Sequence, residues 1–190
     1  MAMRRLFVVL VLALLLCGYA VGAEKDDLKS GPQVGDNLPE PFHSLVVHSE
    51  EPRWVGKKMD FFGAYEADPV VLIFAREMTK PLTKLGKKLD AEIGKRKPGK
   101  LRAIVVMLSD DDTLEKTLKD YGEKQELKHV HLAIMEPDGP RRYNLSKGAE
   151  VTVVMYKNLK VEANHAFTKG ELSNKAVERI LADVPKILPE

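Results

Sequence analysis

Two nearly continuous apolar segments, joined by an amphipathic one, constrain the fold of this chain more than any other feature. Residues 70–75 (VVLIFA) and 101–108 (LRAIVVML) have the length and composition of strands buried on both faces. Between them, apolar residues recur at spacings of three and four from Leu82 to Ile93, and lysines occupy the opposite face. That periodicity predicts an amphipathic helix over residues 81–97. The succession of buried strand, helix and buried strand predicts a parallel β-α-β unit.

The remaining segments extend this alternation. Further strands are predicted over residues 42–48, 130–135, 151–156 and 160–167, a single helical turn over 143–147, and further helices over 112–127 and 172–188. Asp112 and Glu115 have the spacing of a capping box. The pattern predicts an α/β domain with a central mixed, mostly parallel sheet, helices on both faces, and a C-terminal β-hairpin followed by a helix.

The first 23 residues have the organisation of a secretory signal peptide. Arg4 and Arg5 precede an apolar run over residues 6–16, and small residues follow up to Ala23. Because a basic start, an apolar centre and small residues before the cleavage site define such peptides, we expect cleavage after Ala23. The chain then has three parts: a signal peptide (1–23), a polar segment rich in proline and glycine that forms an extended N-terminal arm (24–41), and one domain (42–190).

Two alternatives for the N-terminal segment stay open. The uncharged residues 6–23 approach the minimum length of a membrane span, so the segment has the composition of a retained anchor as well. Cys17 lies in a segment similar to a lipoprotein box, although Leu16 is larger than the usual residue before a lipidated cysteine. We favour an exported protein, periplasmic or extracellular, that contacts a membrane only if this segment is retained or is lipidated at Cys17.

Removal of residues 1–23 changes the charge balance and the cysteine content. The full chain has 30 basic and 28 acidic side chains, and losing Arg4 and Arg5 leaves 28 of each. A net charge of zero argues against nucleic-acid binding, which needs an excess of lysine and arginine to neutralise phosphates. Cys17 is the only cysteine, so residues 24–190 contain none. The domain therefore relies on its apolar core and not on disulfides.

The order of elements and several segments resemble the thioredoxin-like superfamily, in particular its peroxiredoxin and thiol-disulfide oxidoreductase branch. GPQVGDNLP at residues 31–39 is similar to the V-G-x-x-x-P segment that begins domains of this branch. VLIFAREMTKPLTKL at 71–85 resembles its first core strand and active-site helix, and VVMLSDDD at 105–112 its second core strand. VTVVMYKNLK at 151–160 resembles its P-T-x-x-x-x-K-N-G hairpin. The resemblance covers about residues 32–188 and implies a thioredoxin-like fold.

The departures from that family concern its chemistry. Aligned through the end of the first core strand, the family's Cys-x-x-Cys positions fall at Met78, Thr79, Lys80 and Pro81. The family's cis-proline position falls at Val151, with Thr152 kept beside it. Thiol chemistry in such a fold needs a thiolate whose pKa is lowered at a helix N-terminus. Met78 neither ionises nor forms a mixed disulfide, so we expect no thiol oxidoreductase or peroxidase activity.

Each residue of this junction has a structural and a functional interpretation. For Met78 we favour packing at the helix start over a role as a soft Cu(I) ligand or an oxidation site. For Thr79 we favour a helix N-cap. Arg76 and Lys80 form a small anion site in the alternative interpretation, together with free backbone N–H groups of the helix start.

Other polar residues are weaker candidates. His129 and His131 lie two apart in a predicted strand and so share a face, which is the arrangement of a metal-binding pair. Without a third ligand, we favour ordinary surface or edge histidines and assign no metal site. His165 we expect to be structural, and Asp110, Asp111 and Asp112 to be caps of the following helix, with a divalent cation as the alternative.

An aromatic cluster marks the irregular segment at residues 49–68, for which we expect a loop with one short strand. Its members are Trp54, Phe61, Phe62 and Tyr65. We favour an interpretation in which these rings cover the sheet edge, with an exposed partner-binding patch as the alternative.

The sequence thus predicts an exported thioredoxin-like domain without thiol redox activity that acts as a binding or interaction module. We expect a protein partner, no nucleic acid and no cofactor. One alternative is an envelope protein that binds copper or zinc on the same fold, and another is a residual antioxidant role of the redoxin family. An enzyme of another kind is not expected, because no set of nucleophile, base and orienting group is visible.

Overall fold

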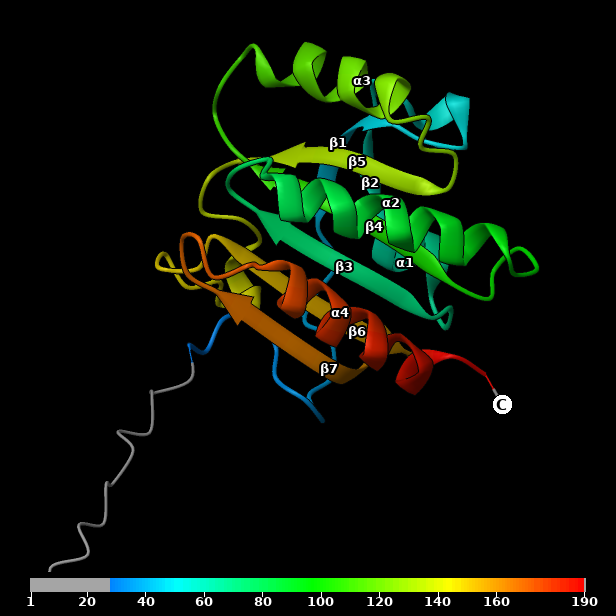
Figure 1. Ribbon diagram of the computed structural model, residues 1–190, viewed down its shortest axis with the longest axis vertical. Coiled ribbons are helices and arrows are strands. Elements are labelled where there is room, and N and C mark those ends of the chain that lie inside the picture. The colour runs from blue at the N-terminus through cyan, green and yellow to red at the C-terminus, as the bar shows by residue number, and fades with distance from the viewer. Residues whose placement is uncertain (1–27, 190) are drawn as a thin grey trace, which may run out of the picture.

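The computed structural model of this protein describes residues 28–189, so the predicted signal peptide lies outside the described residues. Within that range, seven strands form one sheet in the order β2-β1-β5-β4-β3-β6-β7 (Figure 1). The strands are β1 (His43–His48), β2 (Lys58–Asp60), β3 (Val70–Ala75), β4 (Arg102–Leu108), β5 (Val130–Met135), β6 (Val151–Lys157) and β7 (Lys160–Phe167).

The helices in the described part include four α-helices and three short 3₁₀ segments. They are α1 (Phe61–Tyr65), α2 (Lys80–Gly94), α3 (Leu114–Lys124), α4 (Asn174–Asp183), η1 (Pro52–Trp54), η2 (Arg141–Tyr143) and η3 (Val184–Ile187). Every predicted strand and long helix is confirmed, with boundaries shifted by a few residues. Helix α1 is not predicted from the sequence, although Asp60 supplies a local signal as its N-cap. The Asp60 carboxylate accepts the N–H groups of Phe62 and Gly63.

The directions of the strands correct one expectation. Strand β4 pairs in parallel with β3 and with β5, whereas the other four pairings are antiparallel. The sheet is mixed, as predicted, but it is mostly antiparallel, so the expectation of a mostly parallel sheet is wrong. The physical reason is that a helical crossover makes parallel only the two strands that it joins. Strands β1 and β6 are not joined to β5 and β3 by a single helical crossover, and each pairs with that strand in the antiparallel direction.

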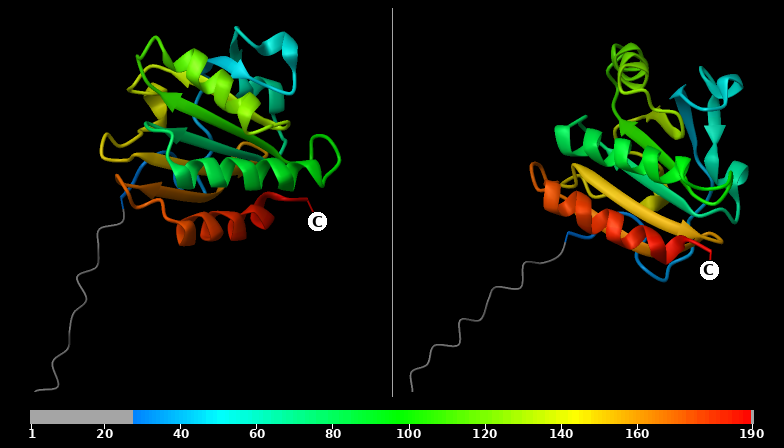
Figure 2. Two further views of the ribbon diagram at one scale, coloured as in Figure 1. Left: turned by 45° about the horizontal axis from the view of Figure 1, so that its top comes forward. Right: turned by 45° about the vertical axis from the view of Figure 1, so that its right-hand side comes forward.

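Helices cover both faces of the sheet, as predicted, but unequally (Figure 2). The long helices α2, α3 and α4 bury Leu85, Leu118 and Val177 in one large core cluster. Because the crossovers from β3 to β4 to β5 step in one direction, right-handed connections place α2 and α3 on the same face. The opposite face carries a smaller cluster, covered by α1, η2 and the chain before β1, in which Phe61 and Tyr143 are buried.

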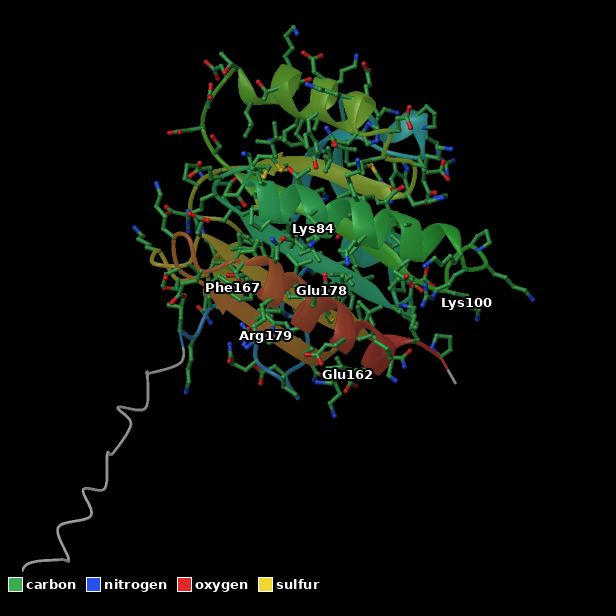
Figure 3. All side chains as sticks on the ribbon, in the orientation of Figure 1. Lys84, Lys100, Glu162, Phe167, Glu178 and Arg179 are labelled. Carbon is green, nitrogen blue, oxygen red and sulfur yellow. The ribbon has the colours of Figure 1, made fainter. Side chains whose placement is uncertain are left out.

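Helices α2 and α4 lie side by side and are joined by exposed ion pairs. Lys84 and Glu178 face each other across the two helices (Figure 3), and the Nζ atoms of Lys84 and Lys88 lie 3.8 and 2.8 Å from Glu178 Oε1. Pairs this exposed add little to stability, so packing of the apolar faces holds the helices together.

Residues 28–41, the described part of the predicted arm, are docked against the sheet. The N–H of Gly35 donates to the carbonyl of Val161 at 2.9 Å, and the N–H of Val161 donates to the carbonyl of Asp36 at 2.9 Å. Ser30 is buried, and its Oγ lies 2.6 Å from Oγ1 of Thr152. The arm therefore covers part of β7, which is otherwise an edge strand with unpaired backbone groups. None of the helices in residues 28–189 has the length and apolar character needed to span a membrane.

Candidate functional site

The turn between β3 and α2 is held by a capping threonine and by packing. Thr79 has an extended backbone, and its hydroxyl accepts the N–H of Leu82 at 3.3 Å, which confirms the predicted N-cap. Met78 is half-buried and packs against the larger core cluster, which confirms the packing interpretation. Pro81 lies in the first helical turn, where a missing N–H costs nothing, and Lys80 is exposed.

The start of β6 lies directly beside this turn. Val151 opens the strand and pairs with Ala75, the last residue of β3. No cis peptide bond occurs within residues 28–189. The backbone before Val151 is already engaged by Arg76, whose N–H donates to the Glu150 carbonyl and whose Nε donates to the Ala149 carbonyl, both at 3.0 Å. These two carbonyls therefore have partners within the domain.

The Arg76 side chain reaches across the carboxyl ends of the strands. Besides the Nε bond to Ala149, its Nη1 donates to the carbonyl of Pro137 at 2.6 Å, so two of its nitrogens are bonded to the two ends of the connection between β5 and β6. It lines a pocket of about 300 Å³ together with Arg141 and Lys147. Lys80 does not line this pocket. This pocket is therefore distinct from the alternative anion site of Arg76, Lys80 and the N–H groups at the start of α2, which stays a prediction.

Glu150 is a buried acid at the same strand end. Its exposed fraction is 8%, and within residues 28–189 its carboxylate makes no hydrogen bond or ion pair. The sequence gives no signal for it, because a glutamate before an apolar strand has the pattern of an ordinary loop residue.

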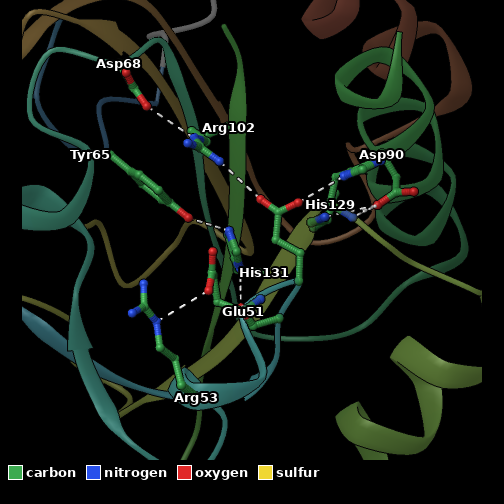
Figure 4. A network of polar contacts seen from close by, with 11 residues as sticks. Glu51, Arg53, Tyr65, Asp68, Asp90, Arg102, His129 and His131 are labelled. Atoms are coloured by element: carbon green, nitrogen blue, oxygen red, sulfur yellow. Dashed lines mark hydrogen bonds and ion pairs between the residues drawn. The ribbon is translucent and has the colours of Figure 1, made fainter. Parts of the chain in front are cut away.

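A second polar cluster lies on the opposite face of the sheet and centres on His131 (Figure 4). The imidazole is fully buried, with Nε2 2.5 Å from the Tyr65 hydroxyl and Nδ1 2.9 Å from Ser49 Oγ. Burial, reinforced by the Arg102 guanidinium, lowers the pKa of His131 from 6.5 to about 3. Burial also raises the pKa of Tyr65. His131 is therefore neutral at physiological pH, with both ring nitrogens engaged.

A chain of ion pairs and hydrogen bonds continues from this cluster toward the surface. Arg102 lies 3.2 Å from Asp68 and 3.1 Å from Glu50, and Glu50 lies 3.0 Å from Nδ1 of His129 (Figure 4). The Arg102 guanidinium also stacks over the Tyr65 ring, 4.7 Å from its centroid. The network thus links four segments that are distant in sequence.

The two histidines predicted as weak metal candidates are separated by these contacts. His129 pairs with Glu50, whereas His131 bonds Tyr65 and Ser49. The expectation of ordinary surface or edge histidines is wrong for His131, which is a core residue. In the described part of the chain, no three His, Cys, Asp or Glu side chains are grouped as ligands for a metal ion.

The aromatic residues of the irregular segment pack on one face of the sheet, against His131 of the interior strand β5, and not at the sheet edge as favoured from the sequence. Phe61 and Tyr65 are buried, and Trp54 and Phe62 pack against them in the smaller core cluster. The rings of Trp54 and Phe61 also lie 5.6 and 5.5 Å from the His131 ring. Apolar rings around an imidazole explain why its charged form is disfavoured.

Two further expectations concern histidine and aspartate residues. His165 is structural, as expected: Nε2 lies 2.9 Å from Asp183 Oδ2, and burial lowers the pKa of the imidazole. The capping box of Asp112 with Glu115 is not formed, because Thr113 is the N-cap of α3 without a side-chain cap bond. Instead, Asp111 accepts the N–H and the hydroxyl of Thr113, both at 2.8 Å.

Comparisons with known proteins identify the fold. Neither protein-family models nor curated protein sequences give a match to this chain. Among solved structures, a secreted disulfide oxidoreductase of Mycobacterium tuberculosis homologous to E. coli DsbE is 14% identical, with a TM-score of 0.54 over 76% of this chain and 94% of that one. The bacterioferritin comigratory protein of Xanthomonas campestris is 12% identical, with a TM-score of 0.55 over 79% and 98%. A mutant of Xylella fastidiosa PrxQ is 12% identical, with a TM-score of 0.55 over 81% and 98%.

The fold is thioredoxin-like. At these identities the likeness concerns the backbone, so the assignment of individual positions to the Cys-x-x-Cys motif stays a prediction. The geometry around those positions is compatible with the assignment, since Met78 and Thr79 lie in the turn from β3 to α2 and Val151 opens the adjacent strand. In this thioredoxin-like domain the turn carries a helix cap and a packed methionine, and residues 18–190 contain no cysteine.

The sequence missed the residues that the fold brings together from distant segments. The sequence pattern places Tyr65 only in the aromatic cover, and it gives no functional signal for Ser49, Glu50, Arg102 or Glu150. The one signal that pointed toward them was His131 within an otherwise apolar strand, since a buried imidazole needs polar partners. The identity of those partners is not encoded locally.

Proposed function

We propose that this chain is an exported, redox-silent thioredoxin-like domain that acts as a binding module. The observation that carries the proposal is the content of the β3–α2 turn. Thiol redox chemistry at this place in the fold depends on a thiolate at the helix N-terminus, whereas this turn contains Met78 packed against the core and Thr79 capping α2. No other described residue supplies a sulfur nucleophile.

The surroundings of the turn support the same proposal. Arg76 occupies the two carbonyls at the start of β6 through its own N–H and Nε groups. In the family that this chain resembles, the element with the cis-proline docks extended substrate chains. The internal bonds of Arg76 at the corresponding predicted position favour a partner that binds elsewhere on the domain. The N-terminal segment, with its signal-peptide organisation, supports export.

Redox assays test the chemical part of the proposal. We expect the purified protein to show no reduction of insulin disulfides and no peroxidase turnover above buffer. A matched variant carrying Met78→Cys and Pro81→Cys installs two thiols at the predicted motif positions, and we expect it to gain measurable disulfide reduction, since a helix N-terminus lowers a thiol pKa. Turnover by the unmodified protein would refute redox silence and favour the residual antioxidant role.

Export and binding need separate measurements. Intact-mass analysis of the protein from its own host is expected to show loss of residues 1–23; a retained or lipidated N-terminus would indicate an anchored protein instead. Affinity capture from an envelope extract, quantified against the same extract passed over an unrelated thioredoxin, is expected to enrich a protein partner. No enrichment at any salt concentration would argue against a binding module.

A further inference from the structure

The carboxyl ends of β3 and β5 border a pocket with an excess of positive charge. Its volume is about 300 Å³, and its lining includes Arg76, Arg141, Lys147, Asp138, Pro140 and Leu145. Three cations thus face one carboxylate. Clefts lined by one sign of charge concentrate ions of the opposite sign, and ligands of open α/β sheets commonly bind beyond the carboxyl ends of strands.

Arg76 is held in one orientation at this pocket. Its Nε and Nη1 donate to the Ala149 and Pro137 carbonyls, at 3.0 and 2.6 Å. Within residues 28–189, its Nη2 has no hydrogen-bond partner, and no carboxylate forms an ion pair with the guanidinium. A guanidinium fixed on one side presents its remaining N–H groups without loss of rotamer entropy on binding.

The other two cations are also unpaired or weakly paired. Arg141 makes no hydrogen bond or ion pair within the described residues. Lys147 lies 3.7 Å from Asp138, with both side chains largely exposed. Such a surface pair contributes little in water, so it does not neutralise the pocket.

The loop that carries Arg141 and Lys147 is well defined by its own contacts. Gly139 has a positive φ of 67°, and a Cβ there would lie 2.7 Å from Leu145 Cδ1. Tyr143 is buried beneath the loop, and the N–H of Ser146 donates to Ser30 Oγ at 3.0 Å. The cations therefore project from a backbone anchored to the core and to the N-terminal arm.

We propose that this pocket binds an oxyanion, a carboxylate or phosphate group of a small ligand, through Arg76, Arg141 and Lys147. The guanidinium of arginine can donate two parallel hydrogen bonds to a carboxylate or a phosphate group, and the lysine ammonium adds a positive charge. The volume lies at the lower end of the range for small-molecule sites. The inference rests on the proposed binding role, which it deepens by naming the chemical class of the ligand.

Titration with two simple anions tests the site. Inorganic phosphate and succinate are added separately to the full chain at constant ionic strength, with amide NMR shifts as the readout. We expect saturable shifts centred on residues 137–147, with a dissociation constant below about 10 mM for at least one anion. The anion with the lower dissociation constant shows whether the site prefers a phosphate or a carboxylate group. Absence of saturation with both anions, or shifts centred elsewhere, would overturn the proposal.

Charge-reversal variants separate a built site from general electrostatics. Arg141→Glu with Lys147→Glu changes only exposed side chains, so the fold is retained, and we expect affinity to fall by about tenfold or more. The control, Lys119→Glu with Lys124→Glu on α3, makes the same change in net charge at exposed lysines that have no partner among residues 28–189, and we expect it to leave affinity within about twofold. Equal weakening in both variants would refute the site. Because the titration involves no turnover, its result is independent of the redox assays. The proposal of an anion site and the proposal of redox silence can therefore be refuted separately.

Discussion

The hydroxyl of Tyr65, the last residue of α1, lies 2.5 Å from Nε2 of His131, and both residues are buried. This contact joins the end of a short helix to a central segment of the sheet. It also completes the hydrogen bonding of an imidazole whose other nitrogen is bonded to Ser49. A polar pair of this kind stabilises the core only while both members are present, because each alone is a buried group without a partner.

Removing the Tyr65 hydroxyl is expected to destabilise the protein. Tyr65→Phe leaves Nε2 of His131 unsatisfied in the core, and we expect the free energy of unfolding, measured with urea, to fall by about 1–3 kcal/mol. Tyr143→Phe is the matched control, since Tyr143 is equally buried and its hydroxyl makes no hydrogen bond within residues 28–189. Its effect is expected to stay within about 0.5 kcal/mol. Equal losses in the two variants would mean that the Tyr65–His131 bond contributes nothing.

The stability of the protein is expected to fall in mild acid because of His131. Its pKa is about 3 in the folded protein and 6.5 ordinarily, so between these values the unfolded chain binds a proton that the folded protein does not. The contribution is fully present above pH 6.5 and is lost as the pH falls toward 3, at up to about 1.4 kcal/mol per pH unit.

A variant isolates this contribution from those of other groups. His165, whose pKa is also lowered by burial, acts in the same direction and remains in both proteins. His131→Gln removes the titrating group, so its unfolding free energy is expected to decline less steeply between about pH 6.5 and pH 4.5. Parallel pH profiles for the two proteins would show that His131 does not govern acid sensitivity.

Two helical glycines are expected to respond to alanine in opposite ways. A Cβ at Gly122 in α3 would lie 2.6 Å from the His48 ring, which is itself held by the Leu127 carbonyl at 2.8 Å, whereas a Cβ at Gly86 in α2 meets nothing within 4 Å. Gly86→Ala should stabilise the protein by about 0.5–1 kcal/mol through helix propensity. Gly122→Ala should lower the melting temperature, because α3 is forced away from β1. Stabilisation by both substitutions would refute this close packing.

The Thr79 hydroxyl that caps α2 is expected to contribute measurably to the free energy of unfolding. Thr79→Ala removes the acceptor of the Leu82 N–H, and we expect a loss of about 1 kcal/mol in unfolding free energy. Thr79→Ser keeps a hydroxyl at the same place and is expected to retain most of the stability. If alanine and serine behave alike, the hydroxyl does not cap the helix.

Elements with local signals could be predicted from the amino-acid sequence. Buried strands β3 and β4 and the helix between them follow from apolar runs and from a spacing of three and four, since burial of one face requires that pattern. The cap at Thr79 follows because its donor, Leu82, is only three residues away. A thioredoxin-like resemblance followed from the order of these elements.

Contacts between groups that are distant in sequence could not be predicted and are seen only in the folded protein. Strands β1 and β5 pair antiparallel, as do β3 and β6, although neither pair is consecutive in the chain or joined by a single helical crossover. His131 is a core residue because Tyr65, 66 residues earlier in the chain, supplies its partner, and Arg76 turns toward carbonyls 61 and 73 residues away. Local patterns encode backbone conformation and burial, whereas a polar side chain takes its role from partners that the folded chain brings beside it.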